Sequence, residues 1–208
     1  MFGKAVPPAA ESDSYQINIH GHCWQTNLDF PLGNAASLGD KRILNYLRDR
    51  ESTVVQRLGA LRARMLAAIS SASVFPNFGF LPGQSTFCVL HPRGPGEVEL
   101  HSWVLVNRSA PREIKDAYRK GVMMTFSPSG VFEMDDVENW KFVSRVNCGH
   151  ETRRVPMYIG LGLESRINHP ELKGEVFRGQ LNEANDRAFL RRWADLMGSG
   201  SRAQARAR

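Results

Sequence analysis

Two adjacent carboxylates near the middle of the chain are the residues best suited to chemistry. Asp135 and Asp136 lie in the stretch Thr-Phe-Ser-Pro-Ser-Gly-Val-Phe-Glu-Met-Asp-Asp-Val-Glu-Asn-Trp, which ends at Trp140. If residues 131–147 are helical, Phe132, Asp136 and Trp140 lie along one face, at i, i+4 and i+8. A carboxylate on an apolar, inward-facing stripe is costly unless it is paired or bound to a metal. Asp136 is therefore either a metal ligand or an acid favoured by the positive end of the helix dipole.

Other potential metal ligands form weaker patterns. His20 and His22 could present two imidazoles on the same face of a strand, as a metal pair requires. We favour the alternative that they belong to a polar strand face at a turn. Cys148 and His150 match the first half of a Rieske cluster motif, but no cysteine follows to supply the second half, so we interpret them as a helix end. The sequence contains no P-loop, Gly-x-Ser-x-Gly or His-Glu-x-x-His motif.

Length and composition are those of one ordinary globular domain. The chain has 208 residues, of which 42% are hydrophobic and 23% are charged. We expect a cytoplasmic protein with no membrane partner, because the start lacks a signal-peptide core and no apolar run approaches the roughly 18 residues that span a bilayer. Three distant cysteines argue against a disulfide framework. The net charge of +6 includes three arginines in the last eight residues, so nucleic-acid binding ranks last among the functions we consider.

Apolar periodicity predicts the elements that position these residues. The short connections between the central strands require antiparallel pairing, so we expect an α+β domain with long helices packed on a curved antiparallel sheet. Disordered segments are expected at 1–13 and in the basic tail, 198–208. The expected strands are two within 14–30, then 72–81, 84–91, 97–107, 155–163 and 174–181; the expected helices are 39–50, 51–69 with Ser52 as its cap, 110–124, 131–147 and 182–197; residues 31–38 form a loop.

The stretch from Thr125 to Trp140 closely resembles a motif in the alpha (large) subunit of Rieske non-haem iron aromatic-ring-hydroxylating dioxygenases. Val74-Phe-Pro-Asn resembles a strand that precedes this motif, and Met157-Tyr-Ile-Gly-Leu-Gly and His169-Pro resemble segments that follow it. The similarity covers residues 14–197 and corresponds to the C-terminal half of an alpha subunit. It implies a helix-grip fold of the Bet v 1-like or START-like kind, a curved sheet wrapped on a long helix, incomplete at its N-terminal side.

The resemblance also implies a site. In this family a mononuclear Fe(II) is held by two histidines and one carboxylate, which leaves positions open for oxygen. The second aspartate of the pair is that carboxylate, which makes Asp136 the implied iron ligand. The implied substrate pocket is apolar and suits a flat aromatic ring. By motif position, its residues are Phe126 and Phe132, with Ser71 and Leu81.

The implied reaction belongs to the catabolism of aromatic hydrocarbons. An aromatic hydrocarbon or aromatic acid is converted with O2 to a cis-dihydrodiol. The electrons come from NAD(P)H through a reductase, a ferredoxin and the 2Fe-2S Rieske cluster of an N-terminal domain. The family often assembles as alpha-subunit trimers, with or without a beta subunit.

The departures from the family pattern qualify these implications. The family's Asn-x-x-x-Asp-x-Tyr-His-x-x-x-x-His segment and the Cys-x-His and Cys-x-x-His pairs of its Rieske domain do not occur in this sequence. We therefore expect the chain alone to bind iron poorly and to be inactive. Two alternatives stay open: a non-catalytic helix-grip module that binds hydrophobic ligands, and a chain that completes its site with another polypeptide. We also expect aggregation or oligomerisation through exposed sheet edges.

Overall fold

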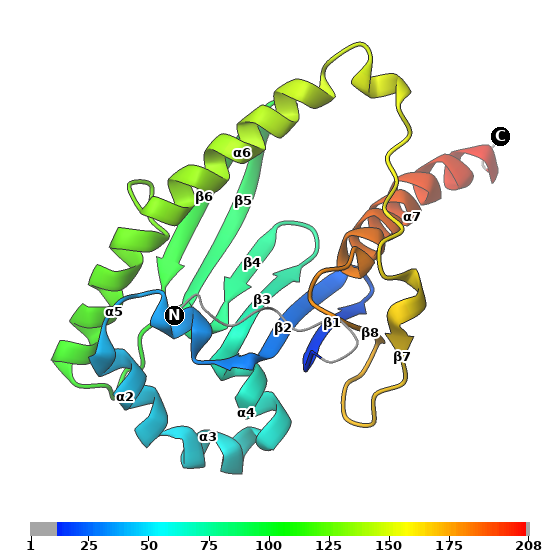
Figure 1. Ribbon diagram of the computed structural model, residues 1–208. Coiled ribbons are helices and arrows are strands. Elements are labelled where there is room, and N and C mark those ends of the chain that lie inside the picture. Colours follow the sequence, from blue (N-terminus) through cyan, green and yellow to red (C-terminus); the bar gives the residue numbers. More distant parts are fainter. Residues whose placement is uncertain (1–11, 207–208) are drawn as a thin grey trace.

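The computed structural model describes residues 12–206 (Figure 1). Most of the start that we expected to be disordered, residues 1–11, lies outside this range. The strands within it form one eight-stranded antiparallel sheet in the order β6-β5-β4-β3-β2-β1-β8-β7. The predicted α+β class with a curved antiparallel sheet is confirmed. The strands are β1 (Ser14–Ile19), β2 (His22–Pro31), β3 (Ala68–Val74), β4 (Phe78–Leu81), β5 (Thr86–Gly94), β6 (Glu97–Val104), β7 (Arg166–Ile167) and β8 (Glu175–Arg178).

The helices occupy the connections and the C-terminal part of the chain. The predicted helix at 131–147 is confirmed as α6, and those at 39–50 and 110–124 agree with α2 and α5 to within two residues. No helix among residues 12–206 has the length and apolar content that a bilayer crossing needs. The α-helices are α1 (Gly33–Ala36), α2 (Lys41–Asp49), α3 (Glu51–Leu58), α4 (Ala60–Ala67), α5 (Arg112–Thr125), α6 (Val131–Asn147) and α7 (Ala184–Arg206); the 3-10 helices are η1 (Pro82–Gln84), η2 (Thr152–Arg154) and η3 (Leu163–Ser165).

Several predicted boundaries were wrong because glycine and proline interrupt the pattern. The strand expected at 72–81 is two strands, since Pro76 has no N–H to continue a ladder and lies in the turn between β3 and β4. The helix expected at 51–69 is broken at Gly59, whose φ of +81° favours glycine. The last two residues of the expected helix, 68 and 69, belong to β3. The residue that precedes the first helical residue is Arg50, so Ser52 is not the cap.

Three further expectations need correction. Residues 155–163 are mostly irregular, with a turn at 161–162 and the first residue of η3 at 163, instead of a strand. Two glycines lie there, and Gly162 has a φ of +79°. The loop expected at 31–38 contains α1. The final helix does not end at Gly198: α7 continues to Arg206 through most of the tail that we expected to be disordered. A glycine inside a helix costs only about 1 kcal/mol relative to alanine, and the neighbouring Ala, Arg and Gln are good helix formers.

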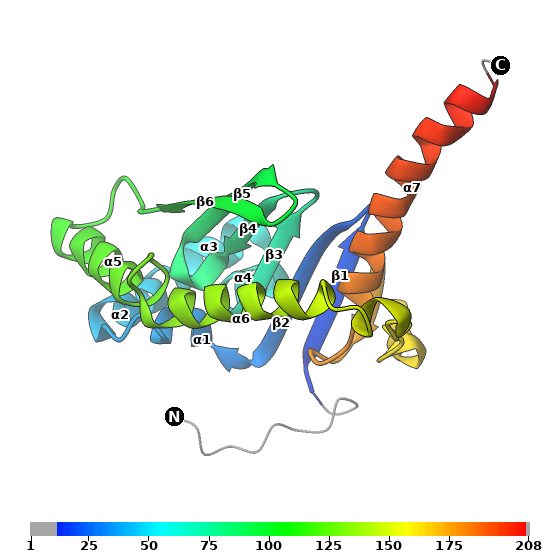
Figure 2. The same ribbon diagram turned by 90° about the horizontal axis from the view of Figure 1, so that it is seen from above.

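The sheet separates two layers of helices. We call the face toward α6 and α7 the inner face and the face packed by α4 the outer face (Figure 2). The outer face carries an apolar core that includes Tyr15, Ile17, Leu28 and Met65. The inner face is more polar, because the side chains that alternate with this core are mainly amides, hydroxyls and thiols.

A buried amide attaches α7 to the inner face. The side chain of Gln16 is only 3% exposed. Its Nε2 donates to the carbonyls of Gln180, at 3.0 Å, and Asn182, at 2.6 Å. Its Oε1 accepts from the N–H of Asn185 at 2.9 Å. Gln16 therefore fixes the first turn of α7 against β1.

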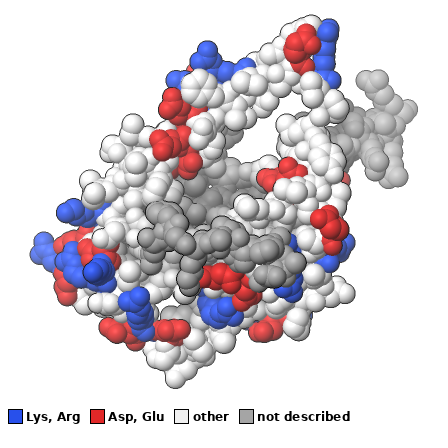
Figure 3. Space-filling model, in the orientation of Figure 1, with Lys and Arg blue, Asp and Glu red and all other residues white. Residues whose placement is uncertain are grey.

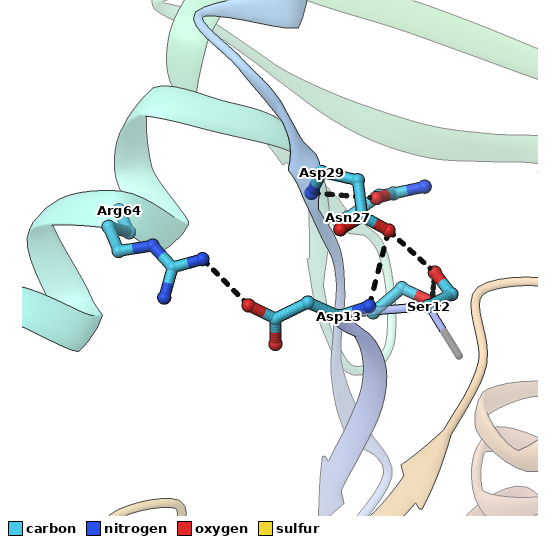
Figure 4. A network of polar contacts seen from close by, with 6 residues as sticks. Ser12, Asp13, Asn27, Asp29 and Arg64 are labelled. Carbon is cyan, nitrogen blue, oxygen red and sulfur yellow. Dashed lines mark hydrogen bonds and ion pairs between the residues drawn. The ribbon is translucent and has the colours of Figure 1, made fainter. Parts of the chain in front are cut away.

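Polar contacts also hold the beginning of β1 (Figure 4). The Ser12 hydroxyl donates to the Asp29 carboxylate at 3.0 Å, and the N–H of Asp13 donates to the same carboxylate at 3.2 Å. The Asp13 carboxylate in turn pairs with Arg64 of α4 at 2.6 Å. On the face shown in Figure 3, acidic and basic side chains lie close together around the periphery instead of gathering by sign.

We predict that Gln16→Met lowers the free energy of unfolding by roughly 2–4 kcal/mol, because it leaves two carbonyls and one N–H without their partner. Urea denaturation would measure this loss. Gln25→Met is the matched control, since Gln25 lies opposite Gln16 on β2 and is half-buried, and we expect a change below about 1 kcal/mol. Equal losses in the two variants would contradict the role of the Gln16 contacts.

Candidate functional site

A pocket of about 190 Å³ lies between α6 and the inner face of the sheet. We call it the inner pocket. One wall comes from strands β3 to β6, and the other comes from α6 and the residue that follows α5. Its lining residues are Ser71, Ala72, Gly79, Phe80, Leu81, Thr86, Phe87, Cys88, Leu100, Ser102, Phe126, Glu133, Asp136 and Trp140.

Four of the five predicted site residues line this pocket: Asp136, Phe126, Ser71 and Leu81. They come from one helix, one helix end and two strands, so the fold brings together positions that are far apart in the sequence. Phe132 is not part of the lining. It is 41% exposed, and its ring centroid lies 5.4 Å from that of Phe126. Phe132 therefore extends the aromatic surface beside the pocket.

The expected burial of Asp136 was wrong. The side chain faces the inner pocket but is exposed, and every other residue of α6 is also at least partly exposed. The reason is that α6 makes its main contacts with α5 at one end and η2 at the other, so that its middle stands away from the sheet. The helix-dipole explanation does not fit Asp136 either, because the acid in the first turn is Glu133. Its position on the pocket wall is what distinguishes Asp136.

Glu133 is a pocket residue that our reading of the sequence missed. It lies three residues before Asp136, which places both carboxylates on the same side of α6. Burial raises the pKa of Glu133, and the neighbouring charge of Asp136 raises it further. The i, i+3 spacing of the two acids is the signal that could have identified it.

Cys88 faces these acids from β5. Burial raises the pKa of its thiol, and the charge of Glu133 adds to the effect. Cys88 lies opposite Gly79 of β4 and Ser102 of β6, so small side chains form the floor of the pocket. A methyl group on Gly79 would come within 2.9 Å of the Cys88 sulfur. Gly79 therefore keeps this part of the floor open.

The candidate histidines do not approach the inner pocket. His20 and Gly21 form the turn between β1 and β2, as the favoured interpretation predicted, and Nδ1 of His22 accepts the N–H of Phe75 at 3.0 Å. Cys148 follows the last residue of α6, which confirms the expected helix end. Within the part of the chain that the structure describes, no three His, Cys, Asp or Glu side chains are placed to hold a metal ion together.

Known proteins resemble this chain in sequence. The family model described as the ring hydroxylating alpha subunit (catalytic domain) matches residues 12–199. The alpha subunit of benzene 1,2-dioxygenase from Pseudomonas putida is 34% identical over 197 residues, which cover 93% of this chain and 44% of that protein. The alpha subunit of biphenyl 2,3-dioxygenase from Rhodococcus jostii is 35% identical over 206 residues, with 93% and 42% covered. The chain thus spans less than half the length of these relatives.

Solved structures show the same fold. Naphthalene 1,2-dioxygenase with indole bound in its active site superimposes with a TM-score of 0.80 and 22% identity over 92% of this chain and 43% of that chain. Naphthalene 1,2-dioxygenase from Rhodococcus sp., also bound to indole, gives a TM-score of 0.65 and 27% identity, with 88% and 44% covered. At these levels of identity, the likeness supports the arrangement of helices around the curved sheet.

We predict that Glu133→Gln raises the melting temperature near neutral pH. Because the pKa of Glu133 is raised in the folded chain, its ionisation favours the unfolded chain, and stability is lost as the pH rises through the raised value. In acid, below the ordinary pKa of glutamate, both states are protonated and the substitution should have no effect. Thermal unfolding followed by circular dichroism at both pH values would test this. Asp135→Asn, an exposed neighbour on α6, is the control, and the same stabilisation in that variant would contradict the assignment.

Proposed function

We propose that this chain, which belongs to the family of ring-hydroxylating dioxygenase alpha subunits, supplies the carboxylate side of the catalytic site in an enzyme that oxidises aromatic rings. The observation that carries the proposal is the convergence of Asp136, Phe126, Ser71 and Leu81 on the inner pocket. A carboxylate beside an apolar wall suits a bound cation next to an aromatic substrate. The resemblance implies the same roles for the same residues.

The residues of this chain do not fit a complete iron site. A non-haem Fe(II) centre of this family needs two histidines and one carboxylate. Asp136 is the carboxylate that we assign, and the six histidines of the sequence include none in the family's Tyr-His-x-x-x-x-His pattern. We therefore derive no reaction step at the metal. What the chain provides on its own is one acidic ligand, a second carboxylate at Glu133 and the walls of the pocket.

The substrate class follows from the lining of the pocket. Phe126 and Trp140 approach it from the helix side, and Leu81 and Leu100 approach it from the sheet. Apolar and aromatic walls favour a flat ring without charge. The relatives are named for benzene and biphenyl, so we propose an aromatic hydrocarbon as substrate, together with O2. We further propose that electrons come from NAD(P)H through partner proteins and a 2Fe-2S cluster carried outside this chain, in a multi-subunit oxygenase.

The exposed side chains of α6 support a covering segment. Large apolar side chains occur on several sides of this helix and are 41–60% exposed: Val131, Phe132, Met134, Val137, Trp140, Phe142, Val143 and Val146. So much exposed apolar surface on one element is typical of an interaction site. We propose that the histidine-bearing segment of an alpha subunit packs against α6 and closes the inner pocket. Without it, association of the chain through this surface and its sheet edges is expected.

We predict that the chain alone shows no stoichiometric, submicromolar site in an anaerobic Fe(II) titration, because one carboxylate cannot retain the ion at neutral pH. Purification together with a polypeptide that carries the family's histidine segment should yield bound iron. Metal analysis should find this iron lost in Asp136→Ala and retained in Asp135→Ala. Iron that persists in the complex with Asp136→Ala would overturn the proposed role of Asp136. A tight site in the chain alone that depends on Asp136 would overturn the need for the second segment.

An iron-free module that binds hydrophobic ligands is the alternative function. The observation that favours it is that the inner pocket is already formed by this chain, with apolar walls on both sides. This alternative predicts saturable binding of naphthalene by the chain alone, measured by fluorescence titration. Binding should be unchanged in Asp136→Asn and at least tenfold weaker in Phe126→Ala, which removes one wall. Absence of saturable binding by the folded chain would exclude the module.

A further inference from the structure

We propose a second small-molecule site on the outer side of the sheet, which takes an uncharged aromatic molecule that carries a hydroxyl group. The site is a pocket of about 500 Å³ between helices α2, α3 and α4 and the ends of β2, β3 and β4. We call it the outer pocket. Its volume lies in the range of small-molecule sites and is far larger than the gaps of ordinary side-chain packing. Its apolar walls include Leu28, Leu47, Val55, Leu66 and Phe80.

The pocket exists because α3 does not reach the sheet. Gly59, with its φ of +81°, turns the chain between α3 and α4. The second helix of this pair packs on β2 and β3, whereas α3 contacts mainly α2 and α4. Val54 and Val55 therefore face the sheet across a space that side chains of the described residues do not fill. Each of these valines is half-buried, as expected for the wall of a pocket.

The outer pocket is separate from the inner pocket. Strand β4 lies between them, and its successive residues Phe80 and Leu81 direct their side chains to opposite faces of the sheet. Leu81 lines the inner pocket only. Phe80 contributes atoms to both linings, so it forms part of the wall between them. Asp136, Glu133 and Phe126 belong to the inner pocket alone.

Two residues with hydroxyl groups form a polar part of the outer pocket wall. The hydroxyl-bearing residues Ser85 and Tyr118 both line it. A ligand hydroxyl can both donate and accept a hydrogen bond, so it suits a wall that carries two hydroxyl groups.

The charged residues of the lining favour an uncharged ligand. They are Arg48, Glu51 and Arg64. Arg64 is already neutralised by Asp13, at 2.6 Å (Figure 4). Arg48 and Glu51 carry opposite charges, so the lining has no excess of either sign. Apolar walls, two hydroxyls and balanced charges together match a phenol with a fused or substituted ring.

Fluorescence titration of the chain with 2-naphthol and with naphthalene would test this site. We expect Tyr118→Phe and Ser85→Gly each to weaken 2-naphthol binding about fivefold, which is the effect of one hydrogen bond. The affinity of the outer pocket for naphthalene should change little, because naphthalene has no hydroxyl group. Glycine is chosen at Ser85 because its φ is +56°. Tyr158→Phe is the matched control, since Tyr158 is 82% exposed. Val55→Trp should fill the pocket and abolish 2-naphthol binding, while Phe126→Ala should not affect it.

Hydrogen exchange of the unmodified chain gives a second measurement that needs no variant. Saturating 2-naphthol should slow exchange in residues 47–68, which form the helical wall of the outer pocket, and should leave residues 126–147 unchanged. Protection of residues 126–147 instead, or loss of binding in Phe126→Ala, would place the ligand in the inner pocket and overturn the proposal. Unchanged affinity in folded Val55→Trp or in both hydroxyl variants would also overturn it.

Discussion

A row of small and polar side chains across the inner face of the sheet is the constraint on which the site depends. Strand register places its members side by side from β1 to β6: Asn18, Cys23, Ser73, Gly79, Cys88 and Ser102. Large apolar residues in the part of this row on β4 to β6 would fill the space under α6. Their absence from the row leaves a floor that is low enough for a pocket. Asp136 can face that pocket because Gly79, Cys88 and Ser102 leave room between the larger side chains of the sheet.

The two helices on the inner face are held in different ways, and the difference matters for the site. Polar contacts from Gln16 fix the first turn of α7, so β1 and β2 are covered. By contrast, α6 is held mainly at its ends, by α5 and η2. Its middle, which carries Glu133 and Asp136, faces the sheet across the inner pocket. The two carboxylates of the site therefore lie on a helix whose middle is only loosely packed against the sheet.

The sequence predicted local features well and the exposure of the site poorly. Helix α6 and the turn at His20-Gly21 followed from apolar periodicity and glycine placement. The motif resemblance predicted five site residues, and four of them, Asp136, Phe126, Ser71 and Leu81, line one pocket. Sequence patterns could not reveal the break at Gly59, because a single glycine inside a helical pattern is often tolerated. They also could not reveal that Asp136 is exposed, since burial depends on what packs against α6 and periodicity indicates only which side chains share a face.

The exposure of Asp136 also constrains the segment that covers it in the proposed site. A carboxylate in water interacts weakly with a cation compared with one in a closed site, because water screens the attraction. The covering segment must therefore exclude water from the pocket as well as bring two histidines. The apolar side chains along α6 provide a surface against which such a segment can pack. Ligand supply and closure would then be one event. Contacts that cover Trp140, which lines the pocket with Asp136 and is 48% exposed, would also lower the dielectric around Asp136 and strengthen its hold on the metal.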